Sequence, residues 1–164
     1  MNYTNALITV IEPGLKLLPA KMDTPEARVM LLAIGMQESR FEYRKQINGP
    51  ARGFYQFEKG GGVKGVMKHP STKLILQDVI FKLGINADDC YECLATDDAL
   101  ATVFARLLLY THPKPLPKLT SDPDESYKYY TDIWRPGKPH RHTWDAFLMH
   151  ARETIINNSK DMKT

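Results

Sequence analysis

The residue best placed to do chemistry in this sequence is Glu38, which ends a nearly continuous apolar segment. Apart from Gly35, every residue from Val29 to Met36 is apolar, which predicts a helix buried on most sides and central to the core. A carboxyl beside apolar walls is desolvated, and the negative end of the helix dipole lies close to it, so both effects should raise its pKa. A raised pKa suits a general acid, which must still hold its proton near neutral pH. On position alone, the alternative is a solvated glutamate at a helix end.

The sequence around Glu38 follows the pattern of a known enzyme family. The segment 38–41 reads ESRF, and after a short loop the segment 49–56 reads GPARGFYQ. Together they resemble the catalytic motifs of the soluble lytic transglycosylases of the lysozyme-like superfamily, Glu-Ser-x-Phe and then Gly-Ala-x-Gly-Leu-Met-Gln. The segment 100–117, followed by Tyr129, Tyr130 and the segment 134–139, is also similar to small phage-encoded members of that superfamily. The resemblance implies one mainly α, lysozyme-like helical domain over 1–164, with a short glycine-rich loop or β-hairpin.

The resemblance also implies roles for particular side chains. Glu38 would be the catalytic acid and base, and Ser39 would orient it. Gln56 would contact the sugar from a turn that forms the cleft wall. Phe54 and Tyr55 replace the family's Leu-Met, which keeps an apolar lining and adds aromatic faces that suit sugar rings.

Further substrate contacts are expected from the second half of the chain. The family's Ala-Tyr-Asn-x-Gly element has a partial counterpart in the segment 109–112, LYTH, from which Tyr110 alone can be carried over. The aromatic residues over 127–134 are interpreted mainly as core. Tyr130 and Trp134 are the candidates among them for sugar platforms.

The resemblance implies cleavage of the β-1,4 bond between N-acetylmuramic acid and N-acetylglucosamine in bacterial peptidoglycan, with no cofactor or metal. Enzymes of this type work with one glutamate. It protonates the leaving oxygen and then takes the proton of the sugar's own 6-hydroxyl, so that 1,6-anhydro ends form. The absence of a convincing partner acid in the sequence favours this route.

Two alternatives to a lytic transglycosylase remain open. A hydrolytic muramidase on the same fold would need an acid to activate water, for which Glu58 is the better spare candidate and Glu42 the weaker one. Asp97 and Asp98 are most simply capping acids at a helix start. The third possibility is a non-catalytic, glycan-binding structural protein of a phage particle. The joint presence of the motif residues counts against it.

Two other groups of reactive side chains are interpreted as structural. Cys90 and Cys93 form a lone CxxC without histidines at zinc-binding spacing, so we expect paired buried thiols or a small local disulfide. The basic segment 140–142, together with Lys138, is interpreted as a solvated loop, with a contact to an anionic glycan as the alternative.

Local signals predict the helices that must position these residues. Caps, prolines in first turns and apolar spacing predict helices over about 23–39, 71–83, 96–110, 122–134 and 143–157. The expected N-caps include Asp23, Ser71, Asp122 and Thr143, and Gly84 sits where a C-terminal glycine belongs. Glycines punctuate 48–65, which predicts a loop with at most a small hairpin. The tail after 157 is expected to be frayed.

Composition limits the classes of function. The chain has 164 residues, 43% hydrophobic and 25% charged, as in soluble globular domains. Its net charge of +3 comes from basic residues interleaved with acidic ones, which favours a weakly anionic partner over nucleic acid. No segment is long and apolar enough to span a membrane, and residues 1–10 lack a secretory signal. Together with the missing signal and the small size, the resemblance to phage-encoded enzymes implies a monomer, or a component of a phage virion, made in the host cytoplasm and released to the periplasm and cell wall.

Overall fold

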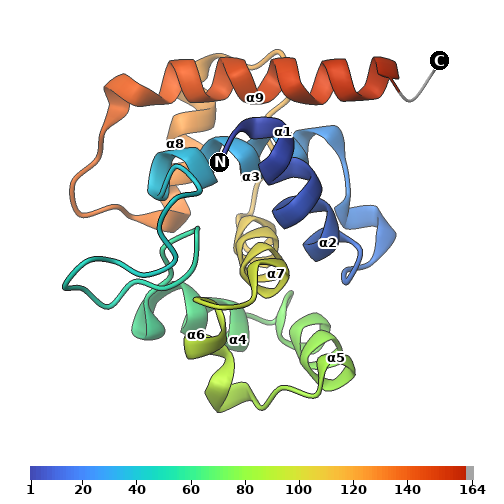
Figure 1. The fold of residues 1–164 in the computed structure, drawn as a ribbon, viewed down its shortest axis with the longest axis vertical. Helices are drawn as coiled ribbons and strands as arrows, with labels where there is room; N and C mark the ends of the chain where they lie inside the picture. The colour runs from blue at the N-terminus through green and yellow to red at the C-terminus, as the bar shows by residue number, and fades with distance from the viewer. Residues whose placement is uncertain (162–164) are drawn as a thin grey trace.

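The computed structural model describes residues 1–161, and its architecture is mainly helical, as the sequence predicts (Figure 1). The α-helices are α1 (Tyr3–Ala6), α2 (Glu12–Leu15), α3 (Pro25–Glu38), α4 (Lys64–Lys68), α5 (Lys73–Leu83), α6 (Cys90–Cys93), α7 (Asp98–Tyr110), α8 (Pro123–Trp134) and α9 (Arg141–Asp161). Short π or 3-10 turns are η1 (Leu7–Ile11), η2 (Ala20–Met22), η3 (Lys59–Val63) and η4 (Ala87–Asp89).

Helix α7 lies between two groups of helices. In Figure 1, α1, α2, α3, α8 and α9 lie above it, and α4, α5 and α6 lie below it. Every residue of α7 from Leu100 to Leu109 is buried, because this helix is covered by neighbouring segments on all sides. Helix α3 is buried from Val29 to Gly35 and packs mainly against α9. The apolar segment before Glu38 is therefore a core helix as predicted, but α7 takes the more central place.

Several helix ends match their sequence signals. Asp97 caps α7 by accepting the backbone N–H of Leu100, and Asp122 caps α8. Gly84 ends α5 in the left-handed conformation, with φ of 69°, which glycine adopts without steric cost.

Three expected helix boundaries are wrong. Thr24 rather than Asp23 caps α3, because Asp23 is paired with Arg28. Helix α5 begins at Lys73, so Ser71 lies before its cap position. Helix α9 begins at Arg141, which places Thr143 inside its first turn. It also continues to Asp161, past the point where fraying was expected, and residues 162–164 lie outside the described part.

The glycine-rich excursion contains no strand within the described chain. Its two antiparallel bridges, Lys45 with Arg52 and Arg52 with Phe57, are isolated. The backbone turns at Gly53 and again at Gln56, both with positive φ, so the pairing cannot extend into a ladder. Of the two expected forms, the loop is therefore present, with a tight turn over 52–57 in place of a β-hairpin, and the glycines that follow form η3 and lead into α4.

None of the helices within residues 1–161 combines the length and the apolar character needed to cross a membrane.

Candidate active site

Glu38 is the last residue of α3, and the chain turns sharply after it. Arg40 and Phe41 both have positive φ, 57° and 53°, a conformation that is uncommon for residues other than glycine. The hydroxyl of buried Ser39 donates to the carbonyl oxygen of Gly35 at 3.3 Å and accepts the N–H of Phe41 at 3.1 Å. Both partners of this hydroxyl are backbone groups, so Ser39 fixes the turn from which the Glu38 side chain projects.

The Glu38 carboxyl is held by Tyr130 of α8. The Tyr130 hydroxyl donates a hydrogen bond to Oε1 of Glu38 at 2.5 Å. Burial raises the pKa of Glu38 from its ordinary value of 4.5 to about 7, and the hydrogen bond from Tyr130 acts in the opposite direction. The desolvation effect inferred from the sequence is therefore the larger of the two, because a low-dielectric environment disfavours the charged carboxylate.

Tyr130 is buried and is not the exposed sugar platform that the sequence suggested. Its side chain is 2% exposed, and its ring stacks on Trp144 of α9 with centroids 5.2 Å apart and planes 6° apart. A ring covered in this way is not available as a sugar platform. Tyr130 instead anchors Glu38 to the packed interface between α8 and α9.

The Glu38 side chain lines a cleft of about 290 Å³. The wall formed by the glycine-rich excursion contributes Gln46, Gln56 and Glu58. Gln56 has a φ of 53° and is braced by a hydrogen bond from its Nε2 to the carbonyl oxygen of Gly53 at 2.9 Å. Glu58 is exposed. The structure therefore brings Glu38, Gln56 and the spare acid Glu58 to one cleft.

The opposite wall is built by the end of α8 and the segment after it. Trp134 lines the cleft, and its Nε1 donates to the carbonyl oxygen of Tyr55 at 3.0 Å, which ties this wall to the tight turn. Arg135 and Lys138 follow and add two exposed cations. The sequence points to Trp134, and to Lys138 as part of a basic loop, but not to Arg135 or Gln46, because no local pattern marks a side chain as part of a cleft formed by distant segments.

Phe54 and Tyr55 do not line the cleft, contrary to expectation. Each is about 1% exposed. Both rings pack against Phe41, with centroid distances of 5.5 and 6.0 Å, and the Tyr55 hydroxyl pairs with that of Thr102. The aromatic residues that replace Leu-Met in the motif thus belong to the core beneath the turn.

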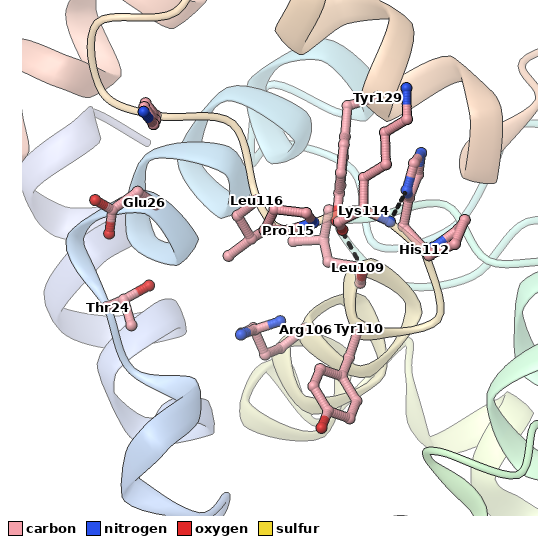
Figure 2. A pocket seen from close by; sticks show the side chains of 12 residues that line it. Thr24, Glu26, Arg106, Leu109, Tyr110, His112, Lys114, Pro115, Leu116 and Tyr129 are labelled. Atoms are coloured by element: carbon pink, nitrogen blue, oxygen red, sulfur yellow. Dashed lines mark hydrogen bonds between the residues drawn. The ribbon is translucent and has the colours of Figure 1, made fainter.

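Tyr110 also lies outside the lining of the cleft. It lies at the end of α7 beside Arg106 and lines a separate pocket (Figure 2). The carry-over of Tyr110 as a substrate contact in the same cleft is therefore wrong.

The remaining candidate acidic residues, Asp97, Asp98 and Glu42, do not line the cleft. Asp97 caps α7 as expected, whereas Asp98 is paired with Arg44 through a two-pronged contact of 2.9 Å. Glu42 is exposed and lies outside the lining of the cleft.

The cysteine and histidine clusters have no contact with Glu38. Cys90 is buried, Cys93 is half-buried, and both are free thiols. Arg141 is paired with Asp124 and Asp145 and begins α9, so its charge is compensated, whereas His140 and His142 are exposed. Within residues 1–161, no group of three histidine, cysteine or acidic side chains is arranged to hold a metal ion.

Comparisons of the chain with models of protein families, with curated proteins and with solved structures found no match. A function must therefore be inferred from the site itself.

Proposed function

We propose that this protein cleaves the β-1,4 bond between N-acetylmuramic acid and N-acetylglucosamine in peptidoglycan, with Glu38 as general acid and base. The observation that carries the proposal is the carboxyl of Glu38, whose pKa of about 7 keeps much of it protonated near neutral pH. It faces a cleft that also presents carboxamides, an indole and cations. Such groups suit an acetamido sugar that carries a carboxylate, because they offer hydrogen bonds, an apolar ring face and opposite charge.

The first step is proton transfer to the glycosidic oxygen. Protonated Glu38 gives its proton to this oxygen as the bond from the oxygen to C1 of the muramic acid breaks, which leaves an oxocarbenium-like centre at C1. The Glu38 carboxylate formed in this step accepts the hydrogen bond of Tyr130. Because that bond favours the charged form, Tyr130 helps the acid to release its proton.

The second step closes a ring within the muramic acid. The Glu38 carboxylate takes the proton of the sugar's 6-hydroxyl, and that oxygen bonds to C1. Glu38 regains its proton, and the product carries a 1,6-anhydro end. The 6-hydroxyl needs no second binding event, since it belongs to the bound sugar and has a high effective concentration.

A hydrolytic outcome is the second candidate, and the position of Glu58 in the same cleft favours it. Glu58 would activate a water that attacks C1, which leaves a reducing end. Mass spectrometry of the released fragments separates the two routes, because an anhydro end is lighter by one water and resists borohydride reduction. We expect anhydro ends; mainly reducible ends would identify a muramidase with the same general acid.

The decisive experiment is clearing of isolated cell-wall sacculi by the purified protein and by Glu38→Gln. Glutamine keeps the shape and can still accept the bond from Tyr130, but it has no proton to transfer. We expect the rate to fall by about 10²- to 10⁴-fold. Glu42→Gln, an exposed acid outside the cleft, is the matched control and should clear like the wild type. Equal clearing by Glu38→Gln would refute its role, and binding of sacculi without clearing by the wild type would support a structural glycan-binding protein.

The resemblance to phage-encoded enzymes further leads us to propose a phage or prophage origin, as an endolysin or as a lysin carried in the virion. Detection of the chain in purified particles would support the second of these.

A further inference from the structure

A second cavity, of about 480 Å³, lies between the start of α3, the end of α7 and the strap 111–122 that joins α7 to α8. Figure 2 shows Arg106 reaching from α7 toward Thr24 and Glu26 in the first turn of α3, with Leu116 of the strap beside it. Thr24 and Glu38 mark opposite ends of α3. At 1.5 Å per residue these ends are about 20 Å apart, so this pocket is distinct from the cleft.

Arg106 is the unusual feature of this pocket. The residue is 5% exposed, and its Nε donates to the carbonyl oxygen of Met22 at 2.8 Å. Within residues 1–161, its two terminal nitrogens make no hydrogen bond or ion pair with a protein group and are open to the cavity, while the guanidinium lies over the Tyr110 ring at 6.0 Å and Asp23 acts on it from a greater distance. By contrast, Arg28 on neighbouring α3 contacts both Asp23 and Glu12.

A buried guanidinium without a counter-ion is energetically unfavourable. Burial lowers the pKa of Arg106, but an arginine remains charged in a protein. A buried charge is ordinarily compensated by a partner of opposite sign. The two terminal nitrogens of Arg106 face this cavity rather than a carboxylate, so they are free to bind an anion that enters it.

The other walls select the kind of anion. Leu109, Pro115 and Leu116 provide apolar surface, and Lys114 and Lys118 stand at the exposed rim. A guanidinium presents a planar fork of donors that matches the two oxygens of a carboxylate. The carboxylate of Glu26 also lines the pocket, which disfavours an anion with two negative charges.

We propose that this pocket binds a small organic monocarboxylate with an apolar body, its carboxylate on Arg106 and its body between α7 and the strap. A short fatty acid and the carboxyl end of a short apolar peptide share this chemistry. The proposal is independent of the reaction proposed for Glu38.

The test is titration of the ¹⁵N-labelled full chain, followed by NMR, at constant ionic strength. The probes are sodium hexanoate, hexanamide, the dipeptide N-acetyl-leucyl-leucine and inorganic phosphate. We expect hexanoate or the dipeptide to shift the Arg106 Nε–H signal and the amides of Tyr110 and Leu116 saturably, and the stronger of the two identifies the source. Hexanamide should bind at least tenfold more weakly. Absence of saturable binding, equal binding of hexanamide, tighter binding of phosphate, or shifts centred on the cleft would each overturn the proposal.

Two variants test the assignment within the pocket. Arg106→Gln should weaken binding of the carboxylate at least tenfold, whereas Lys82→Gln, which removes the same charge from distant α5, should not. If Arg106→Gln fails to fold, Leu116→Trp fills the cavity from the strap while retaining the arginine, and it should weaken binding equally. Unchanged affinity in a folded variant of either residue contradicts the site.

Discussion

The Glu38 carboxyl couples the proposed chemistry to the stability of the protein. Its pKa in the folded state, about 7, lies above the ordinary value of 4.5. Between these two values the native state keeps a proton that the unfolded chain releases. The free energy of unfolding should therefore decrease as the pH rises from about 4.5 to about 7, and remain at the lower level above it.

Glu38→Gln should abolish this decrease in the free energy of unfolding, because glutamine does not ionise. At pH 8 we expect the variant to be more stable than the wild type by up to roughly 3 kcal/mol, the value of the pKa difference. At pH 4, where the wild-type carboxyl is protonated in both states, the two proteins should be nearly equal in stability. Urea denaturation at both pH values measures the difference, and a gain of the same size at both would show that desolvation of the charge is not the cause.

Tyr130→Phe tests the partner of Glu38. Phenylalanine preserves the stacking on Trp144 but removes the hydroxyl that favours the charged form of Glu38. The pKa of Glu38 should rise, so the alkaline fall in kcat/KM should move to higher pH. The rate at lower pH should drop by about tenfold or more, because the carboxylate formed in the reaction loses a charge-assisted hydrogen bond.

Tyr127→Phe is the matched control for that variant. Tyr127 lies one turn earlier on α8, and its buried hydroxyl has no hydrogen-bond partner within the described residues. Its removal should leave the pH profile in place. A profile unaltered in Tyr130→Phe, or moved equally in both variants, would contradict the role of Tyr130.

The sequence identified the position of Glu38 but not its partner. The apolar segment before Glu38 is local, and desolvation follows from it directly. The bond to Tyr130 joins residues 92 positions apart, and a tyrosine in an aromatic-rich helix has the same local pattern whether it stacks on a sugar or on Trp144. Phe54 and Tyr55 were misplaced for the same reason, since only the packing of Phe41 shows which way the turn faces.

At the scale of the elements, the end of α3 depends on a close contact between Gly35 and Phe41. A Cβ added at Gly35 would lie 2.0 Å from Cζ of Phe41. The ring therefore occupies the space that any other residue at position 35 would fill. This contact fixes the direction in which the chain leaves α3, directly after Glu38.

Gly35→Ala should therefore destabilise the protein, although alanine is the better helix former by about 1 kcal/mol. We expect a loss of about 1–3 kcal/mol, typical of overpacking in a core, together with slower clearing because Phe41 must move. Gly65→Ala in α4 is the matched control, since its added Cβ would make one ordinary contact of 4.0 Å. Thermal unfolding compares the two, and a stabilised Gly35→Ala would show that the ring adjusts without cost.

Helix ends were predicted correctly where the signal is local and wrongly where a distant group competes. No ion pair within the described residues competes for the carboxylates of Asp97 and Asp122, and both cap as expected. Asp23 is an equally good cap by type, but the guanidinium of Arg28 binds it, and Thr24 caps instead. The helical segment at the N-terminus was not predicted, because Pro13 and Gly14 suggest a break that the π turn η1 and α2 accommodate.

For the whole molecule, the proposed action on peptidoglycan implies that the distribution of charge affects how the protein reaches an anionic cell wall. Arg135 and Lys138 place two exposed cations on the cleft, and the net charge is +3. Salt screens such attraction over a Debye length of about 8 Å at physiological ionic strength. The rate of clearing of sacculi should therefore fall as salt is added.

Two lysine variants separate the effect of total charge from that of its position. Lys138→Gln and Lys73→Gln both lower the net charge by one, but Lys138 lines the cleft whereas Lys73 is exposed at the start of α5. We expect Lys138→Gln to slow clearing more at low salt and to flatten the dependence on salt, because its charge lies on the cleft in which we propose that the glycan binds. Lys73→Gln should stay close to the wild type. Equal slopes of rate against salt for the two variants would mean that overall charge alone draws the protein to the wall, and a flat slope for the wild type would remove electrostatic attraction from the mechanism.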